Sequence, residues 1–385
     1  QSLQERMEAI KATGLADEVI VEEYEGQKID DIRRYDIDIF TVGSDWIGKF
    51  DYLKEYCEVC YLERTKGISS SELRTEERKI RIGLIGDLAS EINKFVNESK
   101  YVNGAEVVGI YNPLGTEKLD KIQEFEDFDV LLSNVDALYI AMNSFSSYRF
   151  IKSALKCKKH VLVESPITME YCKIEELFQI AKDNKCILME SIKTAYSLAF
   201  SRLILLVKSG MIGDVISIDS TCTSLRKNKK DKRGSLQSWG PYGLLSIFSF
   251  LGTNYIKKEI YTKLDCEGHD IFTKINFYFD GAVSSMKVAD GVKSEGELII
   301  SGSKGYVYVP APWWKTDYFE IRQEHIEDNK RYFYQLEGEG IRYMIVCFLK
   351  AIKTGRGDFY ISKDISKEVS KIMDDFCGKK NVVYL

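Results

Sequence analysis

The segment Ile80-Arg81-Ile82-Gly83-Leu84-Ile85-Gly86-Asp87-Leu88 decides the fold of this chain of 385 residues. Its first part is a short, almost continuous apolar run, which is typical of a strand buried on both faces of a parallel sheet. The run ends at Gly86, and a helical pattern follows directly. A buried strand that turns sharply into a helix predicts the first βα unit of a doubly wound α/β domain.

The rest of residues 79–195 repeats this alternation of strands and helices. Strand patterns recur at 107–111, 137–142, 160–164 and 186–190, with helical patterns between them, for example at 150–157 and 174–181. Strands that alternate with helices predict a parallel sheet covered on both faces. Residues 196–385 contain strictly alternating runs, such as 274–279, which predict an α+β domain with a mixed or antiparallel, open-faced sheet.

Residues 1–76 form a separate predicted unit of the α/β class. Strand patterns at 19–21, 37–42 and 59–62 alternate with helical patterns, which again predicts a parallel sheet. Three strands cannot cover both faces and both edges of such a sheet, so we expect this unit to be incomplete at its amino end. The polar stretch that ends at Arg78 is the predicted linker.

The composition, 44% hydrophobic and 29% charged, is that of a globular protein in water. A net charge of −5 and a pI of about 5.6 disfavour a dedicated nucleic-acid binder. No apolar run reaches the length of a membrane-spanning helix, and the first residues lack the apolar core of a signal peptide. Nine cysteines without framework spacing favour reduced thiols, so we expect a cytoplasmic protein. Cys57 and Cys60 have no second pair at ligand spacing, so no metal site is predicted.

The turn after Gly86 is the place where such domains bind the pyrophosphate of NAD or NADP. Counted from Gly86, the second and third glycines of the GxGxxG fingerprint are replaced by Leu88 and Glu91. Leu88 would block the approach of the pyrophosphate, and the carboxylates of Asp87 and Glu91 would compete with it for the positive end of the helix. Gly83, Gly86 and Asp87 are the candidate cofactor positions, but the pattern predicts the fold better than it predicts binding of NAD or NADP.

Two polar motifs follow strands of the N-terminal unit, namely Gly43-Ser44-Asp45-Trp46 and Arg64-Thr65-Lys66-Gly67-Ile68-Ser69. A cation, hydroxyls and free amides at a helix start suit a phosphate group, although a well-capped turn would carry the same residues. On these motifs, residues 1–76 resemble the C-terminal half of glycerol-3-phosphate cytidylyltransferases. The resemblance implies a CTP site made of Asp45, Trp46, Arg64, Thr65, Gly67, Ile68 and Ser69.

That family also has an HxGH motif that stabilises phosphate, and no histidine is present in the first 159 residues. We therefore expect CTP and Mg²⁺ to be used only if the missing half of the domain precedes Gln1.

From Lys79 onwards the chain resembles the Gfo/Idh/MocA family, which includes glucose–fructose oxidoreductase and inositol dehydrogenase. The resemblance rests on residues 159–166, 234–242, 299–306 and 338–343. It implies a Rossmann domain (79–195) and a larger sheet domain (196–385) that pairs subunits, and hence a homo-oligomer.

The resemblance implies chemistry that this sequence carries only in part. Ser165, before Pro166, replaces the lysine of the Glu-Lys-Pro motif that contacts nicotinamide, and Ser238 replaces the aspartate of the DxxxH pair. Tyr242 takes the histidine position, and some relatives use a tyrosine there as the proton donor. Lys193 is the nearby lysine that could act as a substitute, although a surface lysine at a strand end is the simpler interpretation. Tyr242 and Lys193 are therefore the candidate catalytic residues, with Ser165 and Pro166 as further cofactor positions.

A basic loop at 226–233 precedes this presumed site and contains six lysines and arginines. It could grip a phosphorylated substrate, although a solvated loop is the simpler interpretation.

Two functions remain open from the sequence. In the first, the full gene product is a bifunctional cytidylyltransferase that forms a CDP-alcohol or CDP-polyol, and its degenerate oxidoreductase half serves binding or oligomerisation. In the second, that half is an active NAD(P)-dependent oxidoreductase on a sugar, a polyol or its phosphate, coupled to cytidylyl transfer for surface-polymer precursors. We favour the first, because Leu88, Glu91, Ser165 and Ser238 all depart from the family pattern in the inactivating direction. In both, the partner is a small molecule and neither a nucleic acid nor a membrane.

Overall fold

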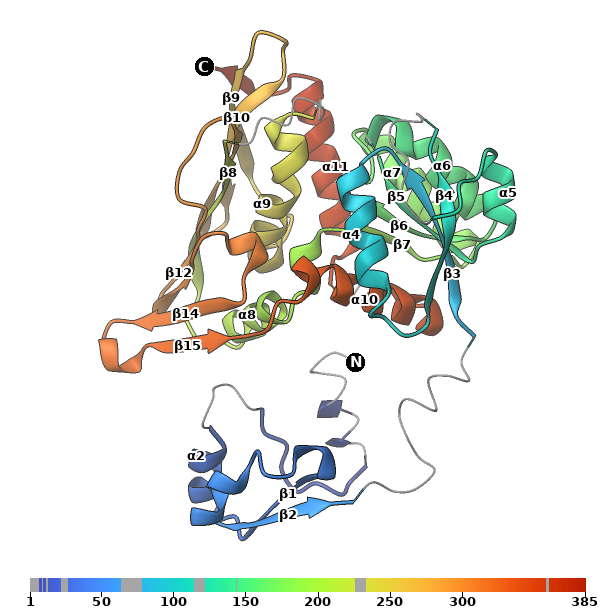
Figure 1. Ribbon diagram of the computed structural model, residues 1–385. Coiled ribbons are helices and arrows are strands. Elements are labelled where there is room, and N and C mark those ends of the chain that lie inside the picture. Colours follow the sequence, from blue (N-terminus) through green and yellow to red (C-terminus); the bar gives the residue numbers. More distant parts are fainter. Residues whose placement is uncertain are drawn as a thin grey trace. The chain divides into compact units, whose positions relative to one another are not determined.

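The computed structural model of the chain describes residues 7–8, 10–11, 13–21, 27–63, 78–113, 122–142, 144–225, 233–357 and 360–385. The chain divides into two compact units, Gln1–Glu76 and Glu77–Leu385 (Figure 1). Among the helices of the described residues, none is long and apolar enough to cross a membrane.

The first unit has a small parallel sheet in which β1 (Ile39–Gly43) pairs with β2 (Glu58–Leu62). Helix α2 (Gln27–Arg34) precedes β1, and the short 3₁₀ helices η1 (Ser44–Trp46) and η2 (Asp51–Glu55) connect the two strands. Because both strands run in the same direction, the residues that follow β1 and β2 lie at the same edge of the sheet.

The strand expected at residues 19–21 is not formed, so that prediction was wrong. Ile20 is 45% exposed, and the carbonyl of Val21 accepts a hydrogen bond from the side-chain amide of Gln27 at 2.9 Å. Three apolar residues are too few to distinguish a strand from a short extended segment, and here a side chain takes the place of a sheet neighbour.

The second unit begins with a five-stranded parallel sheet in the order β4-β3-β5-β6-β7, the arrangement of a Rossmann-type fold. The confirmed prediction of a doubly wound domain rests on these elements. They are β3 (Ile80–Gly86), α4 (Ala89–Ser99), β4 (Ala105–Tyr111), α5 (Phe128–Ser133), β5 (Ala137–Ala141), α6 (Ser144–Lys156), β6 (His160–Glu164), α7 (Tyr171–Asp183) and β7 (Leu188–Ser191).

Alternating side chains of the central strands fill two separate cores. Tyr139 of β5 stacks on Phe95 of α4, with ring centroids 4.1 Å apart, whereas its neighbour Ile140 belongs to a second cluster with residues of α5, α6 and α7. Both faces of the sheet are therefore buried, which explains why its strands are almost continuously apolar in sequence.

A nine-stranded sheet forms the rest of the second unit, in the order β15-β14-β13-β12-β8-β11-β10-β9-β16. Most neighbours are antiparallel, and β8 with β11 and β9 with β16 are parallel. The strands are β8 (Val215–Ser224), β9 (Lys257–Leu264), β10 (Asp270–Phe279), β11 (Ala282–Asp290), β12 (Leu298–Gly302), β13 (Gly305–Val309), β14 (Tyr318–Gln323), β15 (Lys330–Phe333) and β16 (Val382–Tyr384). This mixed sheet confirms the predicted fold class.

Helices pack between the two sheets of the second unit (Figure 1). The long helix α9 (Ser235–Leu251) contacts β8, β10 and β11, and α11 (Lys363–Cys377) contacts both α9 and α7. The remaining elements are η3 (Lys193–Tyr196), α8 (Leu198–Lys208), η4 (Trp313–Lys315), η5 (Ile326–Asp328), η6 (Gly338–Gly340) and α10 (Ile341–Thr354).

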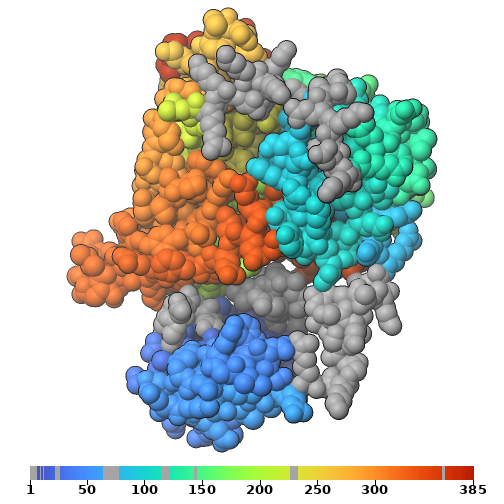
Figure 2. Space-filling model, viewed as in Figure 1, coloured from blue at the N-terminus to red at the C-terminus, as the bar shows by residue number. Residues whose placement is uncertain are grey.

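The β14–β15 hairpin projects from the body of this unit, as Figure 2 shows for the orange segment. Ile326 at its tip is 83% exposed, and Phe333 on the edge strand is 71% exposed. The expected homo-oligomer through this sheet stays a prediction.

Candidate functional site

A cavity of about 320 Å³ lies in the second unit, where the carboxyl ends of β6 and β7 face α9. Ligands of open parallel sheets bind at this edge. The cavity is lined by Ser90, Glu91, Lys94, Glu164, Ser165, Ser191, Lys193, Ser224, Arg233, Ser238, Trp239, Pro241, Tyr242, Asp290, Trp314, Lys315 and Glu339. The structure thus brings together both candidate catalytic residues and one of the candidate cofactor residues, Ser165.

Glu91 and Lys193 both line the cavity and form an ion pair with each other. Glu91 stands in the first turn of α4, and Lys193 follows β7 at the start of η3. Burial alone would raise the pKa of Glu91, but the charge of Lys193 and its hydrogen bond outweigh burial and lower that pKa. Lys193 is only 8% exposed, so its interpretation as a surface lysine is wrong. The ion pair with Glu91 compensates the cost of burying its charge.

Tyr242 from α9 reaches the same cavity, and its phenol interacts electrostatically with Lys193. Burial raises the pKa of Tyr242 above its usual value, and the nearby charge of Lys193 only partly opposes this effect. The phenol of Tyr242 therefore keeps its proton at neutral pH. Beside it, Glu164 accepts hydrogen bonds from Tyr139 and Ser191, each at 2.6 Å, and burial raises the pKa of this carboxyl group.

Ser165 donates a hydrogen bond to Glu190 at 2.5 Å, so its hydroxyl is engaged by a buried carboxyl group. Pro166 comes next in the chain and is buried. A serine hydroxyl is short and neutral, and it cannot extend a positive charge towards a ligand as the family's lysine does.

The β3–α4 turn consists of Asp87 and Leu88 alone, and the amide of Leu88 and two amides of the following helix start have acceptors within the protein. Leu88 N–H donates to the carbonyl of Ala141 at 3.1 Å, and Ala89 N–H donates to the carbonyl of Asp87 at 3.0 Å. The amides of Glu91 and Ile92 both donate to the carbonyl of Leu88. A helix start binds phosphate through free amides, and those of Leu88, Ala89 and Glu91 are not free, whereas the Ile92 amide makes the first regular bond of the helix.

The candidate glycines of this turn have packing roles. An added Cβ at Gly83 would meet Leu138 at 2.9 Å, and at Gly86 it would lie 1.8 Å from the carbonyl oxygen of Ala141. Asp87 is half-buried, and its Oδ1 is buried without a hydrogen-bond partner. Two carboxylates, those of Asp87 and Glu91, therefore flank the position where a pyrophosphate would bind.

Sequence reasoning missed the aromatic wall of the cavity. Trp239 and Trp314 form an edge-to-face pair with ring centroids 5.2 Å apart, although 75 residues separate them. Arg233, the last cation of the predicted basic loop, and Lys315 add positive charge to the lining. Arg226, Lys227, Lys229, Lys230 and Lys232 lie outside the described residues. The motif around Trp239 gave a signal, but nothing in the sequence pointed to its pairing with Trp314.

The N-terminal unit places its first motif as expected, directly after β1. Asp45 and Trp46 lie in η1, and the Trp46 ring is 47% exposed. Lys49 lies over that ring, with its Nζ 4.8 Å from the centroid. The second set of predicted CTP residues, Arg64, Thr65, Gly67, Ile68 and Ser69, lies outside the described residues.

Residues 80–192, which form most of the Rossmann domain, match a known family. The family described as "Oxidoreductase family, NAD-binding Rossmann fold", Gfo/Idh/MocA, matches residues 80–192. These residues are a Gfo/Idh/MocA Rossmann domain. The fold is thus of the NAD(P)-binding type, as the sequence predicted.

Curated relatives fall into two groups, one for each part of the chain. A glycerol-3-phosphate cytidylyltransferase of Bacillus spizizenii is 49% identical over 75 residues, which are 20% of this chain and 58% of that protein. A dTDP-3,4-didehydro-2,6-dideoxy-alpha-D-glucose 3-reductase of Actinomadura kijaniata is 28% identical over 138 residues, 34% of this chain and 42% of that protein. The chain therefore spans little more than half of the cytidylyltransferase, and the resemblance to both families is confirmed.

Solved structures support the fold of the second unit beyond the Rossmann segment. The 3-ketoreductase KijD10 of Actinomadura kijaniata, solved with NADP and TDP-benzene, gives a TM-score of 0.69 at 18% identity. The match covers 80% of this chain and all of KijD10. The Rossmann segment and the nine-stranded sheet together thus have the fold of KijD10.

Proposed function

We propose that this chain is part of a cytidylyltransferase that joins a cytidylyl group to a polyol phosphate, and that its oxidoreductase-like unit binds a ligand or a second copy without redox catalysis. The observation that carries the second half of this proposal is the β3–α4 turn, where the protein itself uses the amides of Leu88, Ala89 and Glu91. The first half rests on the relatives named glycerol-3-phosphate cytidylyltransferase.

The N-terminal unit supports cytidylyl chemistry through its ligand-binding edge. Asp45 and Trp46 follow β1 at the carboxyl edge of a parallel sheet, where α/β proteins hold their ligands. An exposed indole and a neighbouring carboxylate suit the base and ribose of a nucleotide. These residues would hold CTP, and residues 1–76 contain no histidine that could stabilise its phosphates.

The second unit does not fit a dinucleotide bound in the family's manner. Two features oppose the pyrophosphate: the engaged amides and the carboxylates of Asp87 and Glu91. The Leu88 side chain, expected from the sequence to block the pyrophosphate, instead packs against the core and does not line the cavity. The nicotinamide end lacks the family's lysine, because Ser165 occupies its position, and the hydroxyl of Ser165 is bonded to Glu190. Each change removes an attraction or adds a repulsion, so we derive no hydride-transfer step for this unit.

Titration with NADH and NADPH tests this proposal directly. Trp239 and Trp314 line the cavity, so a bound nicotinamide would accept excitation energy from them. We expect no saturable transfer up to about 1 mM cofactor, which means binding weaker than about −4 kcal/mol. Micromolar saturation that disappears in the Trp239→Phe/Trp314→Phe variant would place the cofactor in the cavity and overturn the proposal.

A second candidate function, an active NAD(P)-dependent oxidoreductase on a sugar or polyol, is favoured by one observation. Lys193 and Tyr242 interact within the cavity, so a cation and a neutral phenol stand together as a proton-donating pair. This function predicts that NADPH binds and that Tyr242→Phe abolishes turnover of a carbonyl substrate while binding is unchanged. Loss of binding together with turnover would instead assign Tyr242 a structural role.

A further inference from the structure

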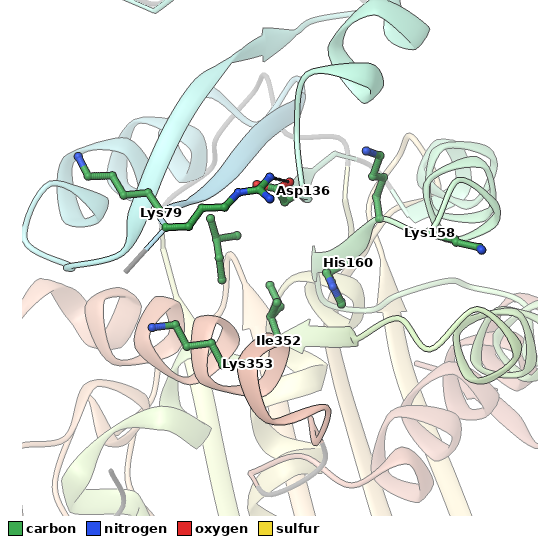
Figure 3. A pocket seen from close by; sticks show the side chains of 9 residues that line it. Lys79, Asp136, Lys158, His160, Ile352 and Lys353 are labelled. Carbon is green, nitrogen blue, oxygen red and sulfur yellow. Dashed lines mark hydrogen bonds and ion pairs between the residues drawn. The ribbon is translucent and has the colours of Figure 1, made fainter. Parts of the chain in front are cut away.

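A second hollow, of about 350 Å³, lies at the opposite edge of the five-stranded sheet (Figure 3). It is formed where β3, β5 and β6 begin, and α10 closes one side through Ile352 and Lys353. The cavity described above lies at the carboxyl ends of β6 and β7, so the two sites occupy opposite ends of the same strands. Neither the cytidylyltransferase motifs nor the dinucleotide fingerprint contributes to this second hollow.

Positive charge dominates its lining. Five cationic side chains and one histidine surround the hollow, against a single carboxylate, that of Asp136. The whole chain has a net charge of −5, so this concentration of cations runs against the average of the protein. The lining cations are Arg78, Lys79, Lys158, Lys159 and Lys353.

Asp136 does not neutralise the hollow, because two arginines already occupy its carboxylate. Arg78 Nη2 lies 3.0 Å from Asp136 Oδ1, and Arg81 donates from its backbone amide and its guanidinium. Burial alone would raise the pKa of Asp136, but the hydrogen bonds from Arg81 hold it below its usual value. The three groups together retain one positive charge at neutral pH.

The lysines differ in how they are held. Lys159 donates to the carbonyl of Val135 at 2.8 Å, so its ammonium group is fixed at the rim. Lys79 and Lys158 are exposed, and within the described part of the chain neither has a carboxylate partner. Figure 3 shows the ammonium groups of Lys79 and Lys353 extending on the same side of the hollow. Lys79 and Lys158, which pair with no carboxylate of the described residues, are thus available to a ligand.

His160 supplies a neutral donor at the inner wall. Its Nδ1 accepts a hydrogen bond from the backbone amide of Ile187 at 3.0 Å, so the neutral ring carries its proton on Nε2. Burial lowers the pKa of His160, and Asp136 opposes this shift only in part. The ring is therefore neutral at pH 7 and donates a hydrogen bond instead of a charge.

We propose that this hollow binds a small phosphorylated molecule, with Lys79 and Lys158 as cationic contacts on opposite sides of the hollow (Figure 3). Ammonium groups and an N–H donor around a pocket of this size suit a phosphate dianion, since charge-assisted hydrogen bonds are the strong ones. Ile80 and Ile352 give the pocket an apolar side, on which the carbon skeleton of the ligand packs. The site is independent of the proposed function, because it needs neither CTP nor a nicotinamide.

Calorimetric titration of the full chain with inorganic phosphate, glycerol 3-phosphate and CTP tests the proposal and separates the sources of the phosphate. We expect saturable binding of at least one probe with a Kd of about 1 mM or tighter, and about tenfold weaker binding in the Lys79→Gln/Lys158→Gln variant. The preferred probe identifies the source, namely free phosphate, a polyol phosphate or a nucleotide. Because the N-terminal unit is itself proposed to hold CTP, CTP binding is assigned to the hollow only where Lys79→Gln/Lys158→Gln weakens it.

The matched control is Lys263→Gln/Lys330→Gln, which removes two exposed lysines from strands of the nine-stranded sheet. It changes the net charge equally and should leave the affinity unchanged. Equal loss of affinity in both variants would reveal a nonspecific charge effect and overturn the proposal. Unchanged affinity in Lys79→Gln/Lys158→Gln, or the absence of binding by all three probes, would overturn it as well. Thermal unfolding of both variants checks that the fold is retained.

Discussion

Replacing Gly86 by alanine is expected to destabilise the Glu77–Leu385 unit by about 3 kcal/mol or more. The new Cβ would lie 1.8 Å from the carbonyl oxygen of Ala141, and Gly86 has φ +144, a conformation that L-residues rarely adopt. The obstacle is backbone of the neighbouring strand β5, so no side-chain rotation relieves it. Urea unfolding of the purified chain, followed by circular dichroism without any nucleotide, measures the change.

Gly210→Ala is the control, because it introduces the same kind of backbone strain without a steric clash of the new Cβ. Gly210 also has a positive φ, +84, but an added Cβ there meets nothing within 4 Å. Its loss should be about 1 kcal/mol, the cost of the backbone conformation alone. Equal losses at the two positions would refute the collision at Gly86. A large loss at Gly86 alone would show that the fingerprint's first glycine is needed by the fold itself, whether or not a cofactor binds.

The sequence predicted those strands and helices whose order of apolar and polar residues follows directly from which of their faces are buried. The strand at 160–164 coincides with β6, and the run that begins at Ile80 is β3, because strands buried on both faces are continuously apolar. The helix α9 was missed as an element, since Gly240 and Pro241 within it read as a loop. Tertiary packing against β8, β10 and β11 overrides that local preference.

The candidate site was only partly visible in the sequence. Lys193 was identified as a candidate from its place at a strand end, but its partner Glu91 stands 102 positions earlier. The sequence assigned Glu91 only a repulsive role towards the pyrophosphate, because no rule of spacing links α4 to η3. The basic hollow around Lys79 and Lys158 was missed for the same reason, since its members come from four separate segments.

Glu91→Gln is expected to destabilise the second unit by about 2–3 kcal/mol at pH 7. The substitution keeps the shape of the side chain and leaves the ammonium group of Lys193 buried without its ion-pair partner. The loss falls below that of a fully buried pair, because the Glu91 side chain is 22% exposed and Glu164 also interacts with Lys193. Glu339→Gln is the matched control in the same cavity: its partners Lys94 and Lys315 are more exposed, so about 1 kcal/mol or less should be lost.

The ion pair of Glu91 also predicts how the free energy of unfolding changes with pH. The pKa of Glu91 is lower in the folded chain than its ordinary value of 4.5, so its contribution is complete above about pH 5 and is lost as the pH falls through the folded-state value. The Glu91→Gln variant lacks this group, so its stability should fall less steeply than that of the wild type between about pH 5 and pH 3. Parallel curves would show that Glu91 is not ionically paired in the folded protein.

Removing both partners separates the cost of an orphaned charge from the net value of the pair. Glu91→Leu/Lys193→Met replaces the ion pair by two apolar side chains, which buried sites often accept without loss. We expect the double variant to be more stable than either Glu91→Leu or Lys193→Met alone, with a coupling free energy of about 1–3 kcal/mol from the double-mutant cycle. Additive losses would mean that Glu91 and Lys193 contribute independently. Strong coupling would instead show that Glu91 forms an internal ion pair with Lys193 at the start of α4. In the family's fingerprint a glycine stands at the position of Glu91, which leaves room for a phosphate.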